Sequence, residues 1–252
     1  MDRRSLLVAA GAVGVTAAVG GAAVAVAADE PEAGRRPQPV VSWELTGGFV
    51  PAGWNLLRAP RLVAYDDGLV IADALKRLRI SGGDLRSLRN HATTVLRDPA
   101  NARRRPGAPQ IADLPSTVFT ARTNGRKFSA TFEGLEETRR DKAYPAPAYA
   151  LLDHLAQLRD RTNRTGSPFH PDAVRMVATL LGPAASAQPW PAGVPVPHFR
   201  KDEFVVQLDL RGREARALTR AVPHPDLAQW PVFRLPDGRR VQLNWRYLLP
   251  HE

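Results

Sequence analysis

Histidine is the residue in this chain best suited to bind a metal ion or to move a proton near neutral pH. None of its six histidines stands in the His-x-x-x-His or His-Glu-x-x-His spacing that places two imidazoles on one face of a helix. Cysteine is absent, which excludes a disulfide framework, a thiolate metal site and a cysteine nucleophile. We therefore predict no metal site and no cofactor, and expect solvated or structural histidines. They are His91, His154, His170, His198, His224 and His251.

Serine and paired carboxylates offer two further routes to catalysis. No serine lies in the Gly-x-Ser-x-Gly turn that exposes the nucleophile of many hydrolases. Two facing carboxylates could hydrolyse a glycosidic bond, but residues adjacent in sequence usually point apart. We therefore predict no catalytic residue, and keep as the alternative an exported hydrolase with an unrecognised carboxylate or histidine site. The adjacent carboxylates are Asp66 and Asp67, Glu136 and Glu137, and Asp202 and Glu203.

The five tryptophans could stack on a carbohydrate ring. We expect Trp43 and Trp245 to lie in the core. Trp190 stands between two prolines and is the best candidate for an exposed ring that contacts a ligand. The alternative is that the loop around Trp190 packs down onto the domain.

Three turn sequences predict the β-hairpins that would build a sheet. Asp66-Asp67-Gly68 and Asp237-Gly238 suit a type I turn followed by a bulge with glycine in the left-handed conformation, and Asn124-Gly125 suits a two-residue turn. The strands around the first turn are apolar on both faces, so we expect that hairpin at the centre of a sheet. For the hairpin near the C-terminus, burial favours the register that places Phe233 with Val241.

The Asn124-Gly125 turn also fixes which side chains face each other across its two strands. In this register large residues oppose small ones on the side that we expect to be buried, and threonine and serine face the other way. The predicted pairs are Ala121 with Phe128, Phe119 with Ala130, and Thr117 with Phe132.

Helices alternate with these hairpins along the chain. One is predicted to begin after Ser81, a good N-cap, and to end before Pro99. A second runs from about Pro147 to Arg161, and a short third covers Ala217–Val222. Further strands are expected near residues 40–45, 173–180 and 204–210. This order predicts an α+β fold, with antiparallel hairpins forming a sheet and about three helices packed on it.

The first 28 residues have the layout of an export signal. Two arginines precede an uncharged apolar stretch, small residues follow, and acidic charge returns at Asp29. Arg3-Arg4-Ser5-Leu6-Leu7 resembles the twin-arginine signal, with Leu6 in place of the usual aromatic residue. The expected signal residues are Arg3, Arg4, Leu6 and Leu7, and the expected cleavage region comprises Ala25, Ala27 and Ala28.

Two alternatives to this export route remain. The chain could leave by general secretion, or the apolar stretch could stay uncleaved as a membrane anchor. Otherwise we expect residues 1–28 to be removed and residues 29–39 to form a flexible leader. Residues 40–252 would then be a single α+β domain with a proline-rich connection at 182–198.

The charge of the chain bears on its partners. It has 35 Lys and Arg against 25 Asp and Glu, giving a net charge of +10. The basic runs are scattered and are not interleaved with aromatic residues, which argues against nucleic acid as a partner. We expect mostly solvated arginines. The partner classes that we retain are a cell-wall polymer and an envelope protein, with membrane contact only through the signal segment.

Two regions resemble a known group of proteins. Gly47–Pro51 with Pro60–Ile71 is similar to the opening of a group of exported actinobacterial proteins of unknown function, and Leu235–Pro250 is similar to their ends. The resemblance spans most of the mature chain and implies export and a single domain, but no activity. With the absence of a catalytic motif, it leads us to expect a secreted or extracytoplasmic, non-enzymatic module with a binding or structural role in the cell envelope or extracellular space.

Overall fold

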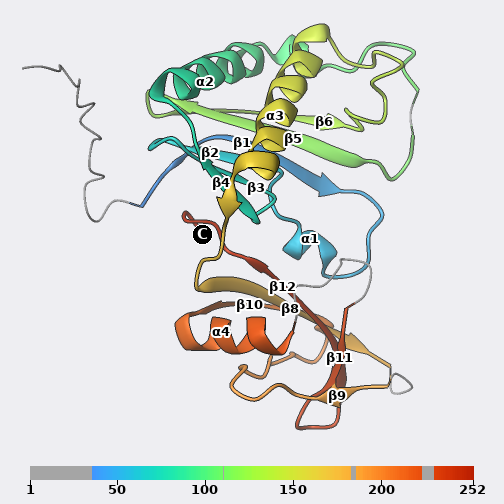
Figure 1. Ribbon diagram of the computed structural model, residues 1–252. Coiled ribbons are helices and arrows are strands. Elements are labelled where there is room, and N and C mark those ends of the chain that lie inside the picture. Colours follow the sequence, from blue (N-terminus) through green and yellow to red (C-terminus); the bar gives the residue numbers. More distant parts are fainter. Residues whose placement is uncertain (1–35, 110, 183–185, 223–229) are drawn as a thin grey trace, which may run out of the picture. The chain divides into compact units, whose positions relative to one another are not determined.

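The structure is a computed structural model that describes residues 36–109, 111–182, 186–222 and 230–252 (Figure 1). Within these ranges no helix is both long and apolar enough to cross a membrane. The predicted signal and cleavage residues and His224 lie outside the described part of the chain.

Seven antiparallel strands form the large sheet, in the order β6-β5-β1-β2-β3-β4-β7. Its central members are the strands of the predicted first hairpin, whose Gly68 has φ +80°. The strands are β1 (Pro39–Gly47), β2 (Leu62–Tyr65), β3 (Leu69–Ala72), β4 (Lys76–Arg79), β5 (Pro115–Thr123), β6 (Arg126–Glu133) and β7 (Ser167–Pro168).

Five strands form the small sheet, in the order β10-β8-β12-β11-β9. All of its pairs are antiparallel except β11 with β9. The predicted α+β class is confirmed, and the strands are divided between two sheets. The members are β8 (Ala173–Leu181), β9 (Gln188–Pro189), β10 (Val205–Arg211), β11 (Val232–Arg234) and β12 (Arg240–Tyr247).

Two helices, α2 (Gly82–Arg97) and α3 (Ala146–Thr165), cover one face of the large sheet, and α4 (Gly212–Ala221) packs on the small sheet (Figure 1). The Asp84 N–H donates to Ser81 Oγ at 3.0 Å, the cap that the sequence predicted for α2. The sequence did not predict α1 (Trp54–Leu57) or the 3₁₀ turn at Pro99–Ala102.

The hairpin registers follow from the turn residues. Asn124 and Gly125 both have positive φ, 49° and 72°, as the expected two-residue turn requires. Their hairpin has the predicted pairs, and Phe119 and Phe132 are buried against α2 and α3. In the last hairpin Phe233 faces Val241, which is the predicted bulged register.

The β2–β3 hairpin is buried on both faces, as its composition predicted. One face joins the core under α2 and α3 through Leu62, Ala64, Val70 and Ala72. The opposite face joins a separate cluster that includes Phe169 and Leu249 through Val63, Tyr65 and Ile71. Packing on this second face brings the end of β12 near the large sheet, where a cavity lies between residues of the two sheets.

Candidate ligand-binding site

A cavity of about 590 Å³ is lined by residues of both sheets, and we call it the inter-sheet cavity. Four arginines and three carboxylates contribute to its wall, together with a mostly apolar remainder. The lining residues are Leu45, Trp54, Leu57, Arg58, Ala59, Arg61, Asp73, Leu75, Pro115, Glu136, Glu137, Arg159, Trp245 and Arg246.

The short helix α1 supplies one wall because it approaches the small sheet closely. Gly53 begins this helix with φ +85°, a conformation that glycine adopts without strain. A Cβ atom at this position would lie 2.9 Å from Val177 Cγ1 in β8. Glycine therefore allows both the turn and the close packing that bring Trp54 and Arg58 to the cavity.

Arg58 differs from the other three arginines of the lining because its polar partner is a backbone carbonyl. Its Nη1 donates to the Gly47 carbonyl oxygen at 2.9 Å. Among the described residues no carboxylate forms an ion pair with Arg58. Burial, and secondly the nearby charge of Arg61, lower the pKa of Arg58. A partly desolvated guanidinium beside another cation favours the approach of an anion.

Asp73 already has its own cationic and polar partners. Its carboxylate accepts from Arg159 Nε at 3.1 Å and from Asn163 Nδ2 at 3.1 Å, and Arg159 Nη2 lies 2.8 Å away. Arg61 lies farther off, with Nη1 3.7 Å from Asp73 Oδ1, and its side chain is 41% exposed. Asp73 therefore pairs with both arginines, more closely with Arg159 than with Arg61.

Arg246 is the most deeply buried arginine of the lining, with 7% of its surface exposed. Its Nη1 and Nη2 donate to the two Glu252 carboxylate oxygens at 2.7 and 2.6 Å. Burial alone would raise the pKa of Glu252, but the hydrogen bonds and charge of Arg246 outweigh it, so this pKa lies below its ordinary value. Arg246 Nε is buried and has no hydrogen-bond acceptor among the described residues.

The adjacent carboxylates Glu136 and Glu137 also line the inter-sheet cavity, where both residues are exposed. Asp73, the partly buried carboxylate of the lining, is occupied as an acceptor by the partners described above. The arrangement offers cations and an apolar wall to a ligand.

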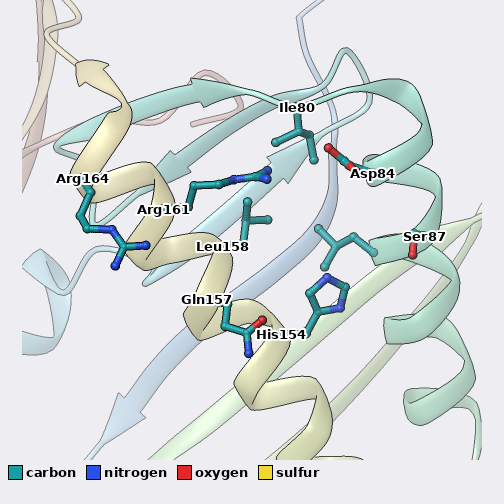
Figure 2. Close-up of a pocket in the computed structure, with 9 residues that line it drawn as sticks. Ile80, Asp84, Ser87, His154, Gln157, Leu158, Arg161 and Arg164 are labelled. Carbon is teal, nitrogen blue, oxygen red and sulfur yellow. The ribbon is translucent and has the colours of Figure 1, made fainter.

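A second hollow of about 430 Å³ lies between α2 and α3, and we call it the helix hollow (Figure 2). Asp84 and Ser87 line it from α2, and His154, Gln157 and Arg161 line it from α3. Figure 2 shows the side chains of Asp84 and Arg161 reaching toward each other across its opening. Both of these residues are exposed, so water solvates their charges.

His154 also forms a histidine pair that the sequence did not predict. Its Nδ1 lies 3.0 Å from His91 Nδ1, and the two rings are stacked at 5.3 Å between centroids. Burial, and secondly the charge of His91, lower the pKa of His154. No group of three potential metal ligands occurs within the described ranges. The pair thus holds one shared hydrogen bond between α2 and α3.

Trp190 lies away from both hollows, on the small sheet. Its Nε1 donates to the Val194 carbonyl oxygen at 2.9 Å, and its ring meets Phe233 edge-on, with centroids 6.1 Å apart. The loop around Trp190 therefore packs onto the domain, which was the alternative prediction. Trp190 as a ligand contact stays a prediction. Trp43 and Trp245 are buried in the core, as expected.

Comparisons with protein-family models, with curated proteins and with solved structures find no match for this chain. The function therefore has to be inferred from the side chains of the two hollows. No sequence motif could have indicated the inter-sheet cavity, because Arg58, Arg159 and Arg246 come from distant parts of the chain and each is preceded and followed by ordinary surface or strand residues.

Proposed function

We propose that this protein is an exported, non-enzymatic binding module of the cell envelope or extracellular space, and that its ligand occupies the inter-sheet cavity. Export is supported by the charged, apolar and small-residue pattern of residues 1–28. The resemblance to exported actinobacterial proteins of unknown function supports the same location.

The observation that carries the binding role is Arg58 in the wall of this cavity. A volume of about 590 Å³ is typical of a small-molecule site. A partly buried guanidinium without a carboxylate partner is costly until an anion neutralises it. We therefore propose a ligand with an anionic group, drawn from the envelope or from the surrounding medium.

Recovery of the protein from the outside of the cell tests this proposal. The full chain is expressed in a bacterium with both export routes, collected from the medium and envelope fractions, and analysed by N-terminal sequencing and native mass spectrometry. We expect a new N-terminus near Asp29 and a bound small molecule that is released on unfolding. Full-length chain in the cytosol would contradict the export claim, and protein free of any ligand would contradict the binding claim.

Two substitutions show whether the cavity holds that molecule. Arg58→Met removes the uncompensated charge and should lower the fraction of ligand-bound protein. Trp190→Ala alters the other candidate contact, on the small sheet, and should leave this fraction unchanged. The opposite result would move the ligand site to the loop around Trp190.

A further inference from the structure

We infer that the inter-sheet cavity binds an amphiphilic anion, a molecule with one carboxylate or phosphate group on an apolar body, with the anionic group at Arg58 and Arg61. This inference rests on the proposed function and names the chemical class of its ligand. Carboxylate and phosphate share the planar or bidentate recognition by guanidinium that defines the site.

The position of the anionic group follows from how the charges of the cavity are balanced. Arg159 is neutralised by Asp73, and Arg246 is neutralised by Glu252. Arg58 has no carboxylate partner among the described residues, and Arg61 shares Asp73, at 3.7 Å, with the closer Arg159. Arg61 lies close enough for its charge, after burial, to contribute to the lowered pKa of Arg58. An anion between them would relieve this repulsion.

The apolar part of the proposed ligand is inferred from the apolar residues that line the cavity. Trp54, Leu57 and Leu75 line the cavity, and Leu75 is 42% exposed. A free inorganic anion would leave this surface in contact with water. An apolar chain or ring would cover it, at about 25 cal/mol for each Å² of apolar surface removed from water.

The number of anionic groups is limited by the acidic side of the cavity. Glu136 and Glu137 are exposed carboxylates of the same lining. A second anionic group on the ligand would meet these carboxylates and find no further uncompensated arginine. The cavity therefore favours a single anionic group over a polyanion such as an extended phosphate polymer.

Calorimetric titration with defined probes tests the inference on the protein recovered from outside the cell. The probes are decanoate, decyl phosphate, 1-decanol and inorganic phosphate, all used below the concentration at which micelles form. We expect one molecule of decanoate or decyl phosphate to bind per chain. Decanol should bind at least about tenfold more weakly, since it lacks the charge-assisted hydrogen bonds, and inorganic phosphate should not bind.

Three variants test whether the binding measured by calorimetry takes place at Arg58. Arg58→Met should weaken decanoate binding by about tenfold or more, and Arg58→Lys should weaken it less because one charge remains. Arg126→Met removes an exposed arginine at the tip of the β5–β6 hairpin and should change nothing. Thermal unfolding of each variant confirms that it is folded.

The outcomes separate this inference from the proposed function. Equal binding of decanol and decanoate, or equal binding by wild type and Arg58→Met, overturns the anionic site. Binding of inorganic phosphate as tight as that of decyl phosphate overturns the apolar part. If no probe binds, the amphiphilic class is wrong. The native mass spectrum described above then decides independently whether the protein carries another ligand.

Discussion

The inter-sheet cavity and the helix hollow are both lined by arginines, yet the surroundings of those arginines differ. In the helix hollow Arg161 is exposed, so water solvates its charge; its side chain reaches toward the exposed Asp84 (Figure 2). In the inter-sheet cavity Arg58 is partly buried, lies near Arg61 and has no carboxylate partner among the described residues. A fully solvated guanidinium needs no ligand, whereas one that has lost part of its water gains from an incoming anion. Burial therefore distinguishes the two hollows better than their composition.

Removal of Glu252 should have the largest effect on the charge balance of the cavity. Glu252→Gln leaves the buried Arg246 without its carboxylate, and we expect a loss of about 3 kcal/mol in the free energy of unfolding. Urea denaturation measures it, with Asp141→Asn as the control, because Asp141 is exposed. A loss no larger than in the control would show that the Arg246–Glu252 pair contributes little to stability.

The Arg246–Glu252 pair should also make the stability of the fold depend on pH in the acidic range. The pKa of Glu252 is lower in the folded protein than in the unfolded chain, so the unfolded chain binds more protons in that range. Its contribution to stability should be complete above the ordinary glutamate pKa and should disappear as the pH falls through the folded value. This part of the acid sensitivity should be missing in Glu252→Gln.

Asp73→Asn should shift the balance of the inter-sheet cavity toward positive charge. Asp73 has φ 52°, which asparagine tolerates, so the backbone should keep its shape. We expect a loss of about 2 kcal/mol in stability, because Arg159 is left partly buried without its partner, together with tighter decanoate binding. Asp153→Asn breaks the exposed pair with Arg139 and should cost at most about 1 kcal/mol. Weaker decanoate binding in Asp73→Asn would contradict the electrostatic account.

Gly53→Ala should disturb the wall made by α1. The added methyl group would meet Val177 in a backbone conformation that alanine adopts with strain, and we expect a loss of about 1–2 kcal/mol together with weaker ligand binding. Gly107→Ala is the matched control, since Gly107 has φ +77° with no atom near the added Cβ. Equal effects of the two substitutions on ligand binding would show that α1 does not shape the cavity.

The helix hollow should respond to pH through its histidine pair, with the smallest effect. The folded-state pKa of His154 is lowered, so the unfolded chain binds more protons, and stability should fall as the pH drops below the ordinary imidazole pKa of about 6.5. The difference in unfolding free energy between wild type and His154→Gln, followed from pH 8 downward, isolates this contribution. Parallel pH curves for the two proteins would show that His154 makes no such contribution. Decanoate binding should be the same in both.

Local chemistry explains which parts of this fold could be predicted from sequence. The Asn124-Gly125 and Asp237-Gly238 turns set the registers of their hairpins within a few residues. Ser81 caps α2 by accepting a hydrogen bond from the N–H of Asp84, three residues later. In contrast, three of the four residues of β4 are basic, and α1 has four residues and packs closely against the small sheet. Neither carries a periodic apolar pattern. The division of the strands into two sheets is likewise a property of long-range packing.

The candidate site could not be predicted from the sequence because it also depends on long-range packing. Arg58, Arg159 and Arg246 are separated by long stretches of chain and resemble the many solvated arginines around them. The histidine pair joins positions 63 residues apart on two helices. Only the folded structure shows which of these charges lose their water and which ones find a partner.

A crystal structure of the protein grown with decanoate locates the ligand directly. We expect the carboxylate within hydrogen-bond distance of Arg58 and the alkyl chain against Trp54 and Leu75, inside the inter-sheet cavity. Decanoate in the helix hollow, or an inter-sheet cavity that contains only water at saturating decanoate, would contradict it.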